Sequence, residues 1–200
     1  MQFETNNIYH IYNRGNNTQT LFFNRENYLF FIQKAKIYIT PFADILAWCL
    51  MPNHFHFMVY VHRLSLEFSE QVTESHQLTK TRTFNDSISI MLRSYTRAIQ
   101  KQEKITGSLF QHRTKAVCLT EVTGVTPAWF QSNYGTIINI TDPEKEYPQI
   151  CFNYIHQNPA KARLGINPED WEFSSYPDYC GRRNGKLINR ARTAEFGLKI

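Results

Sequence analysis

The stretch of this sequence that decides the fold runs from Asp44 to Val61. It consists of Asp44 to Met51 (DILAWCLM), the pair Pro52-Asn53, and His54 to Val61 (HFHFMVYV). The two outer runs are apolar and rich in β-branched and aromatic residues, which is typical of buried strands. The Pro-Asn pair between them has the chemistry of a tight turn. We therefore predict an antiparallel β-hairpin over residues 44–61.

The residues before this hairpin predict a strand and then a helix. Residues 7–13 (NIYHIYN) alternate in the manner of a strand and stop at the turn-forming residues 14–17 (RGNN). Apolar residues then recur at helical spacing over residues 25–39. Asn24 can cap this helix, and Pro41 marks its end.

The residues after the hairpin continue the same alternation. The polar stretch 65–82 is assigned neither a strand nor a helix. An apolar stripe at helical spacing predicts a helix through residues 88–104, residues 115–120 (KAVCLT) predict a fourth strand, and helical spacing returns at about 147–157. This order of elements predicts an α+β fold, a ferredoxin-like or RRM-like antiparallel sheet with helices on one face.

Length and composition favour a single compact unit. A chain of 200 residues, 42% hydrophobic and 14% aromatic, can bury one sizeable core. It contains no apolar run of the ~20 residues that cross a bilayer and no signal-peptide pattern, so we expect a cytoplasmic protein with no membrane partner. The four cysteines are scattered without a C-x-x-C pair, which argues against a disulfide framework or a zinc knuckle.

The net charge of +5 is concentrated in two segments, residues 80–115 and residues 181–194. On the predicted helix, Arg93, Arg97, Lys101 and Lys104 form a basic ridge away from the apolar stripe. The two segments can line one groove for a polyanion such as nucleic acid. Solvated faces and a mobile tail would produce the same pattern, and charge alone does not decide between these interpretations.

The predicted strand 54–61 carries a His-x-His pair. His54 and His56 stand at positions i and i+2, so both imidazoles leave the same face of the strand and can converge on one cation. Such pairs also occur as packed or solvated residues. His62 has the same parity but lies roughly 20 Å along the strand from His56, too far to share an ion.

Five motifs in order give a more specific signal. They resemble the signatures of the REP-associated tyrosine transposases, relatives of insertion-sequence transposases of the HUH type that use one catalytic tyrosine. The motifs are Tyr9 to Gly15 (YHIYNRG), Cys49 to His56 (CLMPNHFH), Gly107 to Arg113 (GSLFQHR), Tyr154 to Ala162 (YIHQNPAKA) and Trp171 to Tyr176 (WEFSSY).

The extent of the resemblance sets the expected domain boundaries. It covers roughly residues 7–180, so we expect a catalytic domain over residues 1–180 followed by a basic C-terminal tail over 181–200. The stretch at about 120–146 is longer than the usual connection in this family. We therefore interpret it as an insertion.

The resemblance implies an HUH-type active site and an enzyme that transfers DNA strands. His54, His56 and Asn158 would bind a divalent metal, Mg²⁺ or Mn²⁺, and Tyr154 would be the nucleophile that forms a 5′-phosphotyrosine. Helical spacing supports this assignment, because Tyr154 and Asn158 are one turn apart and face the same way. Two alternatives stay open: Asn158 can instead cap a helix that begins at Pro159, and Tyr147 is a substitute nucleophile two turns upstream.

The resemblance also implies the partner, single-stranded or hairpin DNA of the REP type, bound by a monomer or a homodimer. Candidate phosphate contacts are Arg14, Arg93, Arg97, Arg113 and Lys115. One rival function is a domesticated module that binds DNA or RNA hairpins without cleavage. A second is a metal nuclease that uses water, with Tyr154 a structural residue.

Overall fold

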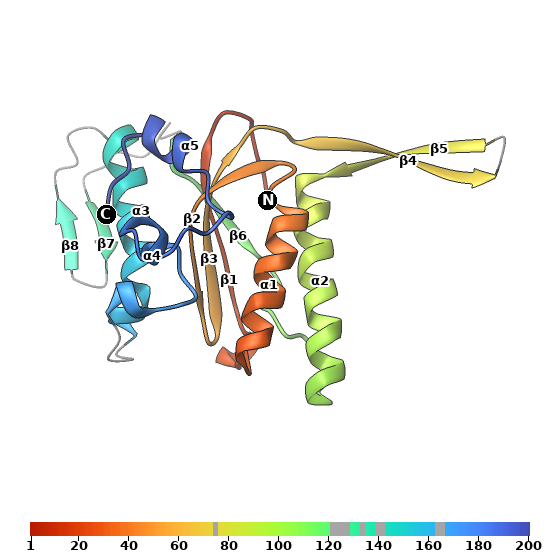
Figure 1. Cartoon of the computed structure of the whole chain (residues 1–200), viewed down its shortest axis with the longest axis horizontal. Helices are drawn as coiled ribbons and strands as arrows, with labels where there is room; N and C mark the ends of the chain where they lie inside the picture. Colours follow the sequence, from red (N-terminus) through yellow and green to blue (C-terminus); the bar gives the residue numbers. More distant parts are fainter. Residues whose placement is uncertain (74–75, 121–128, 133–134, 139–142, 163–166) are drawn as a thin grey trace.

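The structure is a computed structural model that describes residues 1–73, 76–120, 129–132, 135–138, 143–162 and 167–200. Within these ranges, side chains are described except at residues 69–78 and 121–145. A central sheet stands between two layers of helices (Figure 1). In the described part of the chain no helix has both the length and the apolar character needed to cross a membrane.

The central sheet has four antiparallel strands in the order β2-β3-β1-β6. The strands are β1 (Ile8–Arg14), β2 (Ala43–Met51), β3 (His54–Val61) and β6 (Lys115–Cys118). The predicted hairpin is confirmed, with Met51 opposite His54 across the two-residue turn. A register shift between Ile45 and Ala47 interrupts the alternation of β2.

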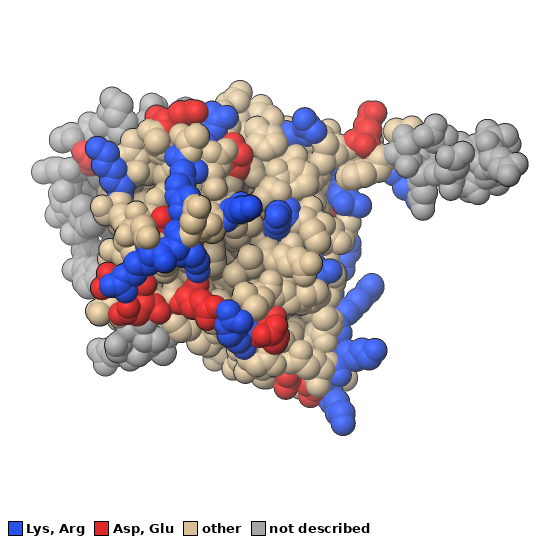
Figure 2. Space-filling view, in the orientation of Figure 1, with Lys and Arg blue, Asp and Glu red and all other residues tan. Residues whose placement is uncertain are grey.

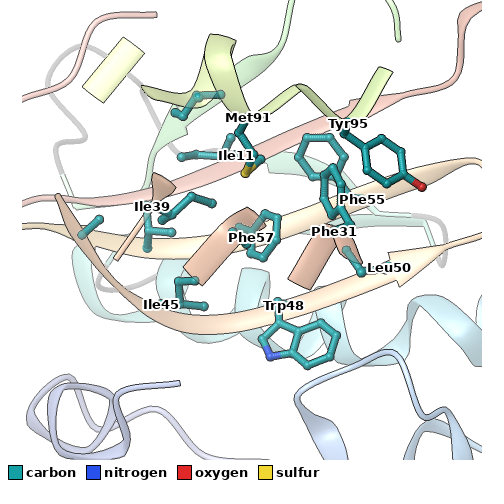
Figure 3. Packing of buried hydrophobic residues seen from close by; sticks show 14 of the residues in the cluster. Ile11, Phe31, Ile39, Ile45, Trp48, Leu50, Phe55, Phe57, Met91 and Tyr95 are labelled. Atoms are coloured by element: carbon teal, nitrogen blue, oxygen red, sulfur yellow. The ribbon is translucent and has the colours of Figure 1, made fainter. Parts of the chain in front are cut away.

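Two helices cover one face of this sheet, α1 (Arg25–Tyr38) and α2 (Phe84–Glu103). The Asn24 side chain caps α1 by accepting from the Asn27 amide, as predicted. Phe55 and Phe57 point from β3 into the core below these helices, where they meet Phe31 of α1 (Figure 3). Tyr95 of α2 packs edge-on against Phe31, so this aromatic cluster joins both helices to the sheet.

The opposite face of the sheet is covered by α3 (Pro143–Lys161), so the prediction of helices on one face holds for α1 and α2 only. The reason lies in the alternation of the strands, because the second face carries apolar residues that also need cover, such as Cys49 and Met58. Phe152 and Ile155 of α3 bury that face. The α+β class itself is confirmed.

Two further hairpins leave this framework. The polar stretch 65–82 forms β4 (Ser65–Thr73) and β5 (His76–Thr83), an antiparallel ribbon that projects from the body (Figure 1). Inside the expected insertion, β7 (Trp129–Ser132) pairs with β8 (Gly135–Ile138). Residues 143–146 of the expected insertion form the start of α3, and residues 121–128, 133–134 and 139–142 lie outside the described residues.

The C-terminal region lies against β2 and includes η2 (Pro168–Asp170), α4 (Tyr176–Tyr179) and α5 (Arg190–Glu195). A further short helix, η1 (Asn16–Thr18), follows β1 at the other end of the chain. Three backbone hydrogen bonds join this region to β2: Leu50 N–H to the Phe173 carbonyl (2.8 Å), Ser175 N–H to Trp48 (2.9 Å) and Asn189 N–H to Ile45 (2.8 Å). Leu198 is buried as well. Residues 181–200, expected as a basic tail, are thus part of the folded body.

Candidate active site

The pairing of β1 with β3 places polar side chains on the face that α3 covers. His56 lies opposite Tyr12 and His54 opposite Arg14, so these four side chains share one face of the sheet. Together with Tyr154 of α3 they line a pocket of about 290 Å³. Its other lining residues are Asn13, Gln111, Arg113 and Lys115.

His54 directs one ring nitrogen, Nε2, toward Asn158 of α3. Its Nδ1 lies 2.7 Å from Asn53 Oδ1, and an amide oxygen only accepts, so Nδ1 carries the proton in the neutral ring. Nε2 then presents a lone pair, and it lies 3.4 Å from Asn158 Oδ1. The Asn158 amide is oriented by its nitrogen, which donates to the Tyr154 carbonyl at 3.0 Å. Two acceptor atoms therefore face each other.

His56 adds a third polar atom. Its ring lies 5.1 Å from the His54 ring, and its Nε2 is buried without a hydrogen-bond partner among the described residues. A divalent cation would satisfy this nitrogen, His54 Nε2 and Asn158 Oδ1 together. No group of three or more His, Cys, Asp or Glu that could bind a metal occurs among the described residues, so the third protein ligand here would be an amide. The residues fit the implied metal.

The protonation states also suit metal binding, because an imidazole must be neutral to ligate. Burial lowers the pKa of His54, and the nearby Arg14 charge lowers it further, against the opposing contact with Asn158. Burial lowers the pKa of His56 well below its ordinary value, and His10 and His54 add to the effect. Burial lowers the pKa of the adjacent His10 to about 4. These shifts all favour the neutral, metal-binding form of the rings.

Tyr154 lies beside these histidines. Its ring is 5.5 Å from the His56 ring, and the Lys161 ammonium stands 4.8 Å from the Tyr154 ring centroid. Burial raises the pKa of Tyr154, while the Asn158 side chain acts on the phenol in the opposite direction. The phenol therefore needs positive charge close by before it can act as a nucleophile at neutral pH.

The two alternatives on α3 can be compared with this geometry. Asn158 lies inside α3, which continues through Pro159 to Lys161, and its side chain bonds back to the Tyr154 carbonyl. It does not cap a new helix. Tyr147 packs at the border of the apolar cluster below α3 and is absent from the pocket lining, and burial raises its pKa.

The predicted phosphate contacts fall into two groups. Arg14, Arg113 and Lys115 line the pocket with Tyr154, whereas Arg93 and Arg97 line a separate hollow of about 620 Å³ between α2 and residues 108–114. Asn13 and Gln111 line both. Figure 2 shows Lys and Arg side chains gathered along the edge of the molecule where α2 lies.

The Asn13 side chain lies between the two hollows and is bonded to the segment 108–114. Its Nδ2 donates to the Gln111 carbonyl (3.1 Å) and to Thr114 Oγ1 (2.9 Å), and Gln111 N–H donates to the Arg14 carbonyl. Residues 108–114 are thereby fixed on the end of β1. This segment therefore separates the pocket from the α2 hollow.

Sequence reasoning assigned no role to His10 or Tyr12, which the structure places at the site. His10 lies behind His56, and Tyr12 lines the pocket. The signal that locates them is the parity of β1, in which residues 10, 12 and 14 share a face. That signal becomes useful only when the register of β1 against β3 is known.

Comparisons with known proteins support the fold. No family model and no curated protein matches this chain. A solved structure described as a REP-associated tyrosine transposase bound to a REP hairpin is similar over 94% of this chain and 92% of that chain, with a TM-score of 0.52 and 15% identity. The fold class is thus one used by a tyrosine transposase. In particular, this chain has the α+β fold of that REP-associated transposase.

Proposed function

We propose that this protein nicks and rejoins single-stranded DNA in hairpin form through a covalent 5′-phosphotyrosine on Tyr154, with Mg²⁺ or Mn²⁺ bound by His54, His56 and Asn158. The observation that carries the proposal is the position of the unpartnered His56 Nε2 and of the close pair His54 Nε2 and Asn158 Oδ1 beside a tyrosine that lines the pocket. The similar solved transposase, bound to a REP hairpin, supports DNA of this kind as the substrate.

The chemistry assigned to each residue follows from its position. When bound, the cation would polarise the scissile phosphate and stabilise charge on it. Tyr154 Oη loses its proton and attacks phosphorus, an Oη–P bond forms, and the P–O3′ bond breaks. The departing O3′ takes up a proton and becomes a 3′-hydroxyl. Attack of that hydroxyl on the phosphotyrosine reverses every step, so rejoining needs no external energy source.

The basic residues hold the substrate. Arg14, Arg113 and Lys115 surround the pocket that contains Tyr154, where a phosphodiester would have to lie for attack. Arg93 and Arg97 continue the basic surface in the α2 hollow. These side chains would bind the DNA backbone and position the strand without reading its sequence.

The decisive test is the change Tyr154→Phe, with Tyr147→Phe as the matched control on the same helix. Phenylalanine keeps the ring and its packing and removes only the oxygen. A labelled hairpin incubated with the wild type and Mn²⁺ should give a protein–DNA adduct on a denaturing gel and an extendable 3′ end. Tyr154→Phe should bind the hairpin and give neither product, while Tyr147→Phe should give both.

The other outcomes identify the rivals. Cleavage without an adduct in the wild type would indicate a metal nuclease that uses water. Binding without cleavage or adduct, across hairpins and metals, would favour the binding module. Normal activity in Tyr154→Phe together with loss of activity in Tyr147→Phe would mean that the enzyme class is right but that Tyr147 is the nucleophile.

A further inference from the structure

His10 is a buried histidine that the proposed chemistry does not use. It lies on β1, is 9% exposed, and its Nε2 is 2.9 Å from His56 Nδ1. The two rings are stacked, with centroids 5.0 Å apart and planes inclined by 23°. Tyr12 stacks on His10 at 4.7 Å and an inclination of 27°. His10 is therefore held in place by rings around it and bonded directly to a candidate ligand.

One proton lies between His10 and His56, and its position decides what His56 can do. If His10 donates, His56 must carry its own proton on Nε2, the nitrogen that is buried without a partner among the described residues. An orphaned buried N–H is rare and costly, and such a nitrogen cannot bind a metal. If His56 donates from Nδ1, its Nε2 offers a lone pair.

The second arrangement leaves no orphaned donor on either ring. His10 then carries its proton on Nδ1, which is not among the buried polar atoms that lack a partner in the described part of the chain. His54 is arranged in the same way, with Nδ1 bonded to Asn53 and Nε2 open. His54 and His56 thus each have a polar partner at Nδ1, which leaves the lone pair of Nε2 available to a metal.

We propose that His10 is a positioning residue that fixes His56 in the tautomer with a free Nε2 and sets the plane of its ring. The bond also places the Tyr154 ring, which packs edge-on against His10 (6.2 Å) and His56 (5.5 Å). The consequence for metal affinity rests on the proposed function. The tautomer itself is a property of the metal-free protein and can be tested alone.

The variants His10→Phe and His10→Gln separate the bond from the packing. Phenylalanine keeps a stacked ring and removes the acceptor, whereas the Gln side-chain oxygen can accept where His10 Nε2 accepts. Met58→Leu is the matched control, because Met58 is buried directly opposite His10 on β3 and contributes no polar atom. Thermal unfolding of each variant verifies that it is folded.

The first measurement is ¹⁵N NMR of the metal-free protein with labelled histidine. His56 should carry its proton on Nδ1 in the wild type and in His10→Gln, and should lose that preference in His10→Phe. The second is Mn²⁺ affinity by titration, without DNA. His10→Phe should bind Mn²⁺ roughly 10- to 100-fold more weakly than the wild type, with His10→Gln much closer to wild type and Met58→Leu unchanged.

Two results would overturn the role of His10. One is a wild-type His56 protonated on Nε2, and the other is a folded His10→Phe with wild-type Mn²⁺ affinity. Failure of the proposed function looks different, because the wild type would then bind no Mn²⁺ and form no adduct. The NMR comparison would still decide the tautomer in that case.

Discussion

Arg93 and Arg97 provide a quantitative test of the proposed DNA binding. They are one turn apart on α2, both are exposed, and both line the hollow beside the pocket. Neither forms an ion pair with a described residue, so their charges are available for phosphates. We expect the double change of Arg93 and Arg97 to Gln to weaken binding to all hairpin sequences alike.

The size of the effect follows from counterion release. Removing one arginine that binds a phosphate should reduce the slope of log affinity against log salt by ~0.7 units for a single strand and ~0.9 for a duplex. Removing both arginines gives a reduction of ~1.4 to ~1.8 units. Between about 50 and 200 mM salt, the affinity of the wild type should therefore fall roughly 10-fold more than that of the double variant.

The assay is fluorescence anisotropy of a labelled hairpin at several salt concentrations, with Arg182→Gln as the control. Arg182 belongs to the second basic segment of the sequence but pairs with Glu169 (3.0 Å) and Asp170 (2.7 Å). Its charge is compensated, so the slope should not change. An unchanged slope in the Arg93 and Arg97 variant, or an equal reduction in Arg182→Gln, would refute the assignment of DNA to α2.

Two further changes test the metal and the buried histidines. Replacing His54 and His56 with Ala should abolish Mn²⁺ binding and cleavage while the protein stays folded; an unfolded double variant would show that the pair is needed for the core. Burial lowers the pKa of His156 to about 3, so between pH ~6.5 and ~3 the unfolded chain binds a proton that the fold excludes, and stability falls as the pH falls. In urea unfolding, His156 should contribute about 2 kcal/mol to the decrease in stability between pH ~6.5 and ~4.5. The variant His156→Gln should lose this contribution, and an equal dependence of stability on pH in the wild type and the variant would contradict the assignment.

The features that could be predicted from the sequence are local ones. The hairpin at residues 44–61 and the cap at Asn24 depend on neighbours within a few positions, and both are confirmed. The shared face of His54 and His56 follows from the two-residue period of a strand, and the structure places both at the pocket. Their role as ligands stays a prediction.

The features that the sequence did not reveal depend on distant partners or on solvent. The ribbon β4–β5 projects from the body and is mostly polar, so its few apolar residues, Leu66, Phe68, Val72 and Leu78, were too sparse to mark two strands. His10 acquires its place only through the pairing of β1 with β3, 46 positions away. Charge patterning likewise treats the two basic segments as equals, because Asp44, which pairs with Arg192, lies far away in the sequence and becomes its neighbour only after folding.

The contact between β2 and the C-terminal region has a consequence for self-association. β2 is an outer strand of the sheet, and a free outer strand is a template on which another chain can add itself. Phe173, Ser175 and Asn189 occupy hydrogen-bonding positions along β2 that an incoming chain would need. A chain cut before Phe173 would keep every pocket residue, since the last of them is Tyr154. It would nevertheless expose the unpaired backbone N–H and C=O groups along the edge of β2. The C-terminal region thus covers the edge of β2 at which another chain would add itself.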